Sequence, residues 1–252
     1  MDSAPPSDPP APDIPAGPLL SVVIPAFNEI ATIDRLLAAV KAADVDKEII
    51  VVDDSSTDGT RERLTEIAAA DSSIRLVQHS HNRGKGAALR TGFNAATGRY
   101  VVVQDADLEY DPAEYGKLLR PLLDDKADAV FGSRFVGGES HRGLQSSPLL
   151  GHRLLPPLSN MFTNLNPTDM ETCYKMVRRD VLQNIRLSED GFGFEPEITA
   201  KLAAYRIDGR PLRIYEVGIS YHGRTYEEGK KIGWKDGLRA LWCIVKYNCF
   251  AR

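Results

Sequence analysis

Acidic side chains gather in three short segments of the sequence, 25–29, 53–60 and 104–109. In the third segment, Asp105 and Asp107 alternate so that both can present oxygen to one side of an extended chain. Carboxylates that meet at one place repel each other unless they bind a cation or accept hydrogen bonds. Oxygen-only ligands suit Mg²⁺ or Mn²⁺, and Mg²⁺ binds diphosphates beside one or two carboxylates. The pattern therefore indicates a divalent metal and a phosphorylated ligand.

A second group of residues could contact phosphate. Gly84-Lys85-Gly86 opens a predicted helix, and helix N-termini attract anions, so Lys85 is a candidate cofactor-binding residue. The spacings of P-loops and of dinucleotide-binding loops do not occur here, and an ATPase or a dehydrogenase is unsupported. His79 and His81 are more typical of loop residues than of metal ligands.

The acidic segments need a scaffold that brings them together. Short apolar, β-branched runs alternate four times with helical patterns, which predicts an α/β fold with a mostly parallel sheet and helices on both faces. In such sheets ligands bind at the carboxyl ends of the strands. The predicted strands are 19–25, 48–52, 74–78, 100–104 and 127–131.

Residues at the predicted helix starts have ordinary structural explanations too. Asn28 is a good N-cap, and Asp111-Pro112 is a favourable first turn. Asp58 and Asp111 are explained equally well as helix caps and as ligand-binding acids. Beyond Phe131 we expect a Gly- and Ser-rich loop at 132–148, helices near 149–165, 195–206 and 233–248, and a strand near 211–217.

Composition limits the class of protein. The 252 residues, 42% hydrophobic and 26% charged, are typical of a soluble globular chain, and a net charge of −4 argues against nucleic acid as a partner. No run approaches the ~18 apolar residues of a membrane span. The three cysteines form neither a metal spacing nor an even disulfide set, which suits a reducing cytosol. Seven prolines in residues 1–18 predict a disordered tail.

A series of motifs resembles glycosyltransferase family 2, and within it the dolichyl-phosphate mannose and glucose synthases. The resemblance runs from about Leu20 to Lys231 and implies a GT-A fold over 19–232, a nucleotide-sugar donor (UDP-glucose or GDP-mannose) and a divalent metal (Mg or Mn). The motifs are SVVIPAFNE, VVDDSSTDGT, NRGKGAALRTGF, QDADLEYDP, FGSRF, TDMETCYK and GRTYEEGKK.

The resemblance also implies roles for individual residues. Asp107 and Glu109 would bind the metal, although mannose synthases commonly have Gln at the position of Glu109. Arg134 would lie near the acceptor phosphate, and Asp169 matches a family aspartate, with Cys173 in place of the family's glycine. The positions that match family contacts to the donor are Pro25, Phe27, Glu29, Asp53, Asp54, Asp105, Arg224 and Lys230.

These residue types suggest a mechanism. A metal together with Arg224 and Lys230 would neutralise the leaving diphosphate. A polyprenyl phosphate acceptor is already an anion and needs no catalytic base, only cations such as Arg134, Arg142 or His141 to steer it. In-line attack on the anomeric carbon would invert its configuration.

Residues 233–252 predict a C-terminal amphipathic helix. Its Trp and Leu stripe, flanked by Lys and Arg, suits a membrane surface and suits core packing equally well. With a polyprenyl phosphate acceptor, the enzyme would be cytoplasmic and peripheral at the inner, cytosolic membrane face.

Two other functions stay open. A family relative could glycosylate a soluble hydroxyl, and it would then need a base such as Asp169, Glu171 or Glu195. A non-catalytic nucleotide-sugar-binding domain is the other alternative, and the intact acidic and basic sets argue against it.

Overall fold

The computed structural model describes residues 17–136, 165, 167–224 and 234–250. The helix expected near 149–165, Lys230 and all but the last two residues of the Pro-rich segment lie outside these ranges, as do His141 and Arg142. Of the helices within the described ranges, none is long and apolar enough to cross a bilayer.

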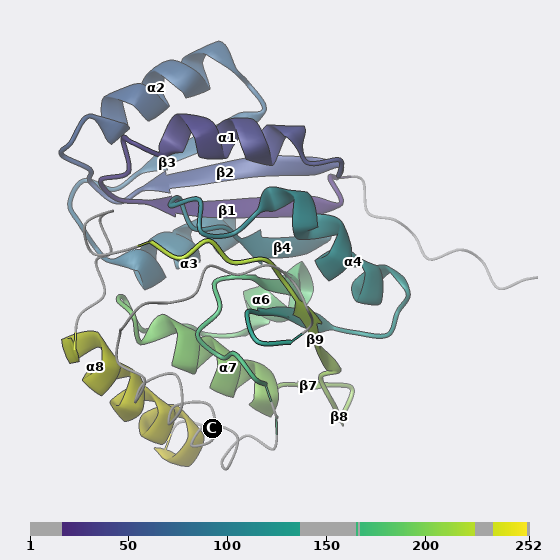
Figure 1. Ribbon diagram of the computed structural model, residues 1–252. Coiled ribbons are helices and arrows are strands. Elements are labelled where there is room, and N and C mark those ends of the chain that lie inside the picture. Colours follow the sequence, from purple (N-terminus) through teal and green to yellow (C-terminus); the bar gives the residue numbers. More distant parts are fainter. Residues whose placement is uncertain (1–16, 137–164, 166, 225–233, 251–252) are drawn as a thin grey trace, which may run out of the picture.

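The described residues form a seven-stranded sheet in the order β3-β2-β1-β4-β6-β5-β9 (Figure 1). All neighbouring strands are parallel except the two pairs made by β6, which runs antiparallel to β4 and to β5. The mostly parallel sheet predicted from the sequence is thus confirmed. The strands are β1 (Leu20–Ala26), β2 (Lys47–Asp53), β3 (Ile74–Gln78), β4 (Tyr100–Val103), β5 (Ala129–Ser133), β6 (Lys175–Arg178) and β9 (Ile214–Gly218), with a separate hairpin of β7 (Arg206–Ile207) and β8 (Arg210–Pro211).

Strand register brings the acidic loops to one edge of this sheet. Ala26 at the end of β1 pairs with Asp53 at the end of β2, and Val23 of β1 pairs with Val103, the last residue of β4. The segments that follow these three strands therefore leave the sheet side by side.

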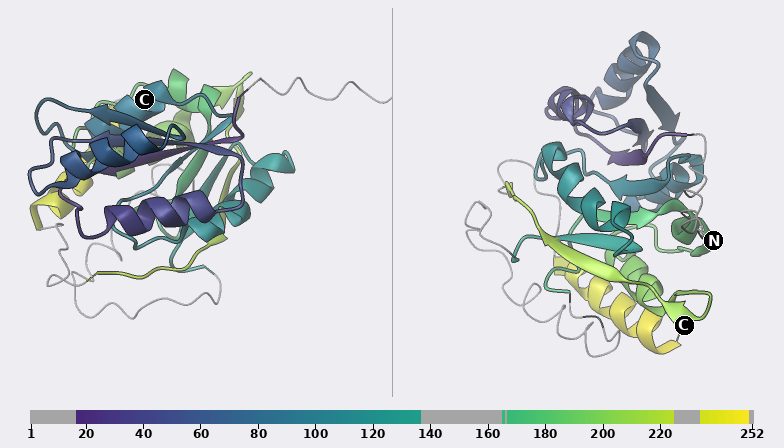
Figure 2. Two further views of the ribbon diagram at one scale, coloured as in Figure 1. Left: turned by 90° about the horizontal axis from the view of Figure 1, so that it is seen from above. Right: turned by 90° about the vertical axis from the view of Figure 1, so that its right-hand side faces the viewer.

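Helices cover both faces of the sheet, with α1 and α4 on one face and α3 and α6 on the other (Figures 1 and 2). The C-terminal helix α8 packs on α7. The helices are α1 (Ile33–Ala42), α2 (Thr60–Ala70), α3 (Lys85–Ala95), η1 (Pro112–Glu114), α4 (Tyr115–Leu123), α6 (Arg179–Asn184), α7 (Phe194–Ala204), α8 (Trp234–Val245) and the π-helical turn η2 (Lys246–Phe250).

The helix starts differ in part from expectation. Asp111 does cap η1, since its carboxylate accepts a hydrogen bond from the amide of Ala113. The prediction for Asn28 was wrong, because α1 begins after Thr32. Asn28 instead has a left-handed φ of 56°, and its side-chain oxygen accepts a hydrogen bond from the Thr57 amide, tying the loop after β1 to the loop after β2.

Strand β6 and helix α6 were not expected from the sequence. The strand has only four residues, KMVR, and its Lys175 is nevertheless buried. A charged residue inside a short strand hides the apolar pattern by which the other strands are recognised. The fold supplies the buried ammonium group of Lys175 with three acceptors, the carbonyl oxygens of Met170 and Thr172 and the carboxylate of Glu195.

Helix α3 packs very closely on β1. A Cβ added at Gly92 would lie 2.3 Å from Cγ1 of Val23, whereas a Cβ added at Gly116, in the first turn of α4, would meet no described atom within 4 Å. Glycine at position 92 is therefore a packing requirement, while glycine at position 116 is not.

This contrast gives a test of the packing. Gly92→Ala should lower the free energy of unfolding by about 1–3 kcal/mol, because the new methyl group overpacks the contact with β1. Gly116→Ala, the matched control, should raise it by about 0.4–1 kcal/mol by restricting the unfolded chain. Urea denaturation measures both, and equal effects at the two sites would contradict the close approach.

Candidate active site

Acids from two of the three loops converge on one arginine. The Nη1 atom of Arg224 lies 3.2 Å from Oε2 of Glu29, and its Nη2 atom lies 3.2 Å from Oδ2 of Asp107. The amide of Arg224 also donates to Oε1 of Glu109 at 2.8 Å. Residues far apart in the sequence, from the segments after β1, β4 and β9, thus form one charged cluster.

Burial and mutual repulsion make this cluster sensitive to its cations. Burial, together with the negative charges of Asp105 and Glu109, raises the pKa of Asp107 to about 7, and Arg224 acts in the opposite direction. The ionised form of such an acid is stabilised when a positive charge approaches it. The site is therefore prepared to bind a cation.

A divalent metal fits these residues, with one rearrangement. Within the ranges that the structure describes, no group of three or more His, Cys, Asp or Glu side chains is arranged to hold a metal ion. The guanidinium of Arg224 stands between the acids, and its Nε makes no hydrogen bond although it is buried. The donors are carboxylate oxygens that already face one positive group, which is the chemistry that Mg²⁺ and Mn²⁺ require.

Asp105 lies in an adjoining ion-pair network. Its carboxylate pairs with Nζ of Lys85 at 2.8 Å, and Lys85 lies 3.6 Å from Oε1 of Glu195, an oxygen without a hydrogen bond. The other oxygen of Glu195 accepts a hydrogen bond from Lys175 at 2.6 Å. Lys85 thus contacts an acid of the candidate site, at a position where the sequence pattern suggested a phosphate contact.

Protein groups already bind several amides at the helix end that carries Lys85. Asp54 accepts hydrogen bonds from the amides of Arg83 and Gly84, at 2.9 and 2.7 Å, and from Nδ1 of His79 at 2.6 Å. The amide of Gly86 donates to the carbonyl oxygen of Asp190 at 2.7 Å. These amides are therefore held by protein groups, and His79 has the structural role that its position suggested.

The same edge of the sheet carries both buried and exposed candidate residues, namely Asp53, Pro25 and Phe27. The carboxylate of Asp53 is fully buried and bonds to Nε of Arg61 at 2.6 Å and to the amide of Ser56 at 3.1 Å. Pro25 is the sixth residue of β1, and Phe27, just beyond its end, exposes 37% of its surface. An exposed aromatic ring beside buried, ordered carboxylates could stack on a planar ligand.

Arg134 and Asp169 form a two-bond ion pair. Nε and Nη2 of Arg134 donate to the two oxygens of Asp169 at 2.6 and 2.7 Å, and the guanidinium lies over the ring of Tyr221. The hydroxyl of Tyr221 donates to Glu109 at 2.7 Å. Tyr221 therefore joins the Arg134 pair to the acidic cluster, so the two predicted groups form one continuous site.

Sequence reasoning missed Tyr221 and Lys175. Tyr221 lies three residues before Arg224 and just before the motif GRTYEEGKK, and an aromatic residue there carried no distinct signal. Lys175 is the last residue of the motif TDMETCYK, which assigned it no role of its own. Glu171, a candidate base, is held where burial and the charge of Glu195 raise its pKa to about 7.

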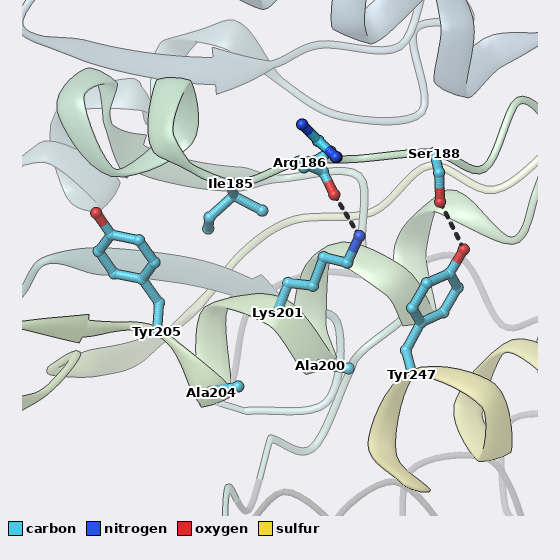
Figure 3. A pocket seen from close by; sticks show the side chains of 8 residues that line it. All are labelled: Ile185, Arg186, Ser188, Ala200, Lys201, Ala204, Tyr205 and Tyr247. Carbon is cyan, nitrogen blue, oxygen red and sulfur yellow. Dashed lines mark hydrogen bonds between the residues drawn. The ribbon is translucent and has the colours of Figure 1, made fainter. Parts of the chain in front are cut away.

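The structure also has a surface cavity of about 330 Å³ away from this site (Figure 3). Helix α7, the loop after α6 and Tyr247 of η2 form its walls, and none of its lining residues belongs to the charged cluster. Lys201 crosses it to donate to the carbonyl oxygen of Arg186, and Tyr247 bonds Ser188. This cavity therefore contains none of the residues to which we assign catalytic or donor-binding roles.

Comparison with known proteins identifies the family. The profile described as Glycosyl transferase family 2 matches residues 21–186. The chain belongs to glycosyltransferase family 2. It is an enzyme of the glycosyltransferase class, and its mostly parallel sheet with helices on both faces is the GT-A fold.

Individual relatives show how far the similarity extends. An Agl6 hexosyltransferase of low-salt glycan biosynthesis from Haloferax volcanii is 34% identical over 86% of this chain, but the chain spans only 52% of that protein. An undecaprenyl-phosphate mannosyltransferase from Micrococcus luteus is 30% identical over 91% of this chain and 94% of its own length. In structure, a glucosyl-3-phosphoglycerate synthase from Mycobacterium tuberculosis, in complex with Mn²⁺, UDP and phosphoglyceric acid, shares the fold with a TM-score of 0.69 at 24% identity, over 93% of this chain and 80% of that one.

The contacts of Asp54 predict a structural effect. Asp54→Ala should lower the free energy of unfolding by roughly 2–4 kcal/mol, because it leaves two partly buried amides and the buried His79 without their acceptor. Asp58→Ala, which removes an exposed acid that bonds to Thr60 at the start of α2, should cost about 1 kcal/mol. Thermal or urea unfolding measures the difference, and a smaller loss for Asp54→Ala than for Asp58→Ala would contradict the role assigned to Asp54.

Proposed function

We propose that this glycosyltransferase transfers a hexose, glucose or mannose, from a UDP- or GDP-sugar to a polyprenyl phosphate of the dolichyl type, in a metal-dependent and inverting reaction. The observation that carries the proposal is the convergence of Glu29, Asp107 and Glu109 on Arg224 beside the Lys85–Asp105 pair. Alternating positive and negative groups at the carboxyl edge of a parallel sheet suit a metal-bound diphosphate.

The donor diphosphate would meet both kinds of charge. Asp107 and Glu109 are the residues that would hold Mg²⁺ or Mn²⁺, which supplies positive charge to the leaving group. Arg224, released from its acids, and Lys230 would bind the diphosphate oxygens, since arginine suits bidentate phosphate contacts. Structural neighbours of the same fold were solved with UDP and Mn²⁺ or Mg²⁺, which supports this assignment.

The nucleoside would lie over the loops after β1 and β2. Phe27 offers an exposed ring beside Pro25, and Glu29 lies next to the cluster at Arg224. Asp53 and Asp54, whose carboxylates are buried and hydrogen-bonded within the protein, would shape the loop against which the base lies. Asp105, fixed by Lys85, is the residue expected to contact the ribose.

The acceptor phosphate would bind on the Arg134 side of the site. A phosphate monoester is an anion near neutral pH, so it can attack without a catalytic base. Asp169 holds the guanidinium of Arg134 over the ring of Tyr221, whose hydroxyl bonds Glu109 of the acidic cluster. Several relatives are named for polyprenyl or dolichol phosphate acceptors, which supports this class of acceptor.

A soluble hydroxyl acceptor is the second candidate. Glu171 has a carboxyl oxygen that is buried without a hydrogen bond, and its raised pKa suits a general base near neutral pH. One structural neighbour named glucosyl-3-phosphoglycerate synthase was solved with phosphoglyceric acid. The two candidates differ in the solubility of the product.

A lipid acceptor requires contact with a membrane, and α8 is suited to it. Leu238, Leu241 and Trp242 are exposed on one side of this helix, while Ala240 and Ile244 pack inward. Arg239 and Lys246, both partly exposed, flank the apolar residues. This arrangement suits peripheral binding at the cytosolic membrane face.

The transfer reaction tests the proposal directly. Radiolabelled UDP-glucose and GDP-mannose are each incubated with a short polyprenyl phosphate and with 3-phosphoglycerate, and the product is extracted into organic solvent. We expect label in the organic phase, a loss of at least about a hundredfold in Asp107→Asn, and loss of activity with EDTA. Asp124→Asn, at the exposed end of α4, is the control and should be unchanged. A product that stays in water selects the soluble acceptor, and full activity in EDTA contradicts metal dependence.

Binding to vesicles tests the role of α8. The double variant Leu238→Ala/Trp242→Ala should bind anionic liposomes at least about tenfold more weakly than the unsubstituted protein in a sedimentation assay, because two large apolar side chains are lost. Leu123→Ala, which removes a similarly exposed leucine from α4, is the matched control and should bind normally. Equal binding by all three proteins would contradict membrane contact through α8.

A further inference from the structure

Glu189 is a buried acid that takes no part in the chemistry described above. Its carboxylate accepts hydrogen bonds from Nη2 of Arg239 at 2.6 Å, from Nζ of Lys246 at 2.9 Å and from the hydroxyl of Tyr247 at 2.7 Å. Burial alone would raise its pKa, but the hydrogen bonds from these partners lower the pKa of Glu189 to about 2. All three partners belong to α8 or η2, so one charged side chain fastens the C-terminal helix to the body of the enzyme.

The backbone beside Glu189 fastens the start of α3. The carbonyl oxygen of Asp190 accepts the hydrogen bond from the amide of Gly86, and that of Glu189 accepts one from Nη1 of Arg90 at 2.7 Å. A Cβ added at Gly84 or Gly86 would lie 2.4 or 2.1 Å from one of these two carbonyl oxygens. The two glycines around Lys85 are therefore required by the close approach of this loop.

The same loop leads into α7 and meets α8 a second time. A Cβ added at Gly193 would lie 2.6 Å from Sγ of Cys243 and 2.8 Å from Oε2 of Glu189. Two residues later, Glu195 faces Lys85 at 3.6 Å. Residues 189–195 thus touch α8 on one side and, on the other, Lys85, the ion-pair partner of Asp105 in the candidate site.

We infer that Glu189 is a positioning residue through which the placement of α8 sets the position of Lys85, and with it Asp105, in the donor site. The chain of contacts runs from Arg239 and Lys246 to Glu189, then through the Asp190 carbonyl to the first turn of α3. For donor binding the inference rests on the proposed function. For the coupling of α8 to α3 it does not.

A matched pair of variants separates positioning from simple stability. Asp128 is likewise a fully buried acid, bound by Arg210 at 2.6 Å and by the amide of Arg213 at 2.9 Å, but it lies at the amino end of β5, away from the site. Glu189→Gln and Asp128→Asn each replace a buried carboxylate that has arginine partners with a neutral amide of the same size. Both should lower the unfolding midpoint, and only Glu189→Gln should affect α3.

Amide hydrogen exchange reads the coupling in the full chain without any ligand. We expect exchange at Gly86 and Ala87, the amides that face the Asp190 carbonyl, to speed up at least tenfold more in Glu189→Gln than in Asp128→Asn. Arg239→Met/Lys246→Met, which removes the cations and keeps Glu189, should reproduce the effect. Equal exchange at these amides in the Glu189 and Asp128 variants would overturn the inference.

Calorimetric binding of UDP and GDP with Mn²⁺ then reads the donor site. Glu189→Gln should lower the affinity for whichever nucleotide binds by about tenfold. This loss of affinity should not add to the loss caused by Lys85→Met, because both substitutions act on the same contact. Asp128→Asn should bind normally, and its effect should be independent of Lys85→Met. Additive losses for Glu189→Gln and Lys85→Met would overturn the role in donor binding. If the unsubstituted protein binds neither nucleotide, the proposed function fails, while the exchange experiment still decides the coupling.

Discussion

The repulsion between carboxylates at one edge of the sheet is the constraint on which this structure depends. Asp107, Glu29 and Glu109 are brought together by strand register, and burial makes the negative charge of Asp107 costly. Arg224 compensates this charge within the protein. An edge arranged in this way binds cations readily, and its arginine becomes available to an anion once another cation takes its place. The proposed chemistry with a metal-bound diphosphate depends on this exchange of partners.

The surroundings of the cluster show how ordinary packing serves it. Asp54 accepts from the amides of Arg83 and Gly84, and the Asp190 carbonyl accepts from those of Gly86 and Ala87, so protein groups hold the start of α3, where Lys85 pairs with Asp105. On the other side, Asp169 orients Arg134, and Tyr221 connects that pair to Glu109. Several acids that looked like ligand contacts therefore act first as internal acceptors. Because these acids fix the loops around the cluster, the other charged side chains are held in positions from which they can face a ligand.

Much of the fold could be predicted because its signals are local. The first five strands are continuous apolar runs, and the helices between them have a clear apolar periodicity, so the parallel sheet and the edge carrying the acids followed directly. Strand β6 escaped prediction because it is short and contains a buried lysine whose partners, Met170, Thr172 and Glu195, are partly remote in sequence. The N-cap assigned to Asn28 was wrong for a related reason, since its acceptor oxygen is used by Thr57, in another loop.

The order of residues alone was enough to indicate the GT-A architecture, the acidic edge and the family, because strand and helix patterns and motif spacing are properties of neighbouring residues. Which charges meet was decided only by folding. The contacts of Arg224 with Glu29, of Lys85 with Glu195 and of Glu189 with α8 join segments separated by long stretches of chain. Ion pairing and close packing depend on distances of a few ångströms in space, and those distances exist only once the sheet and its helices are assembled.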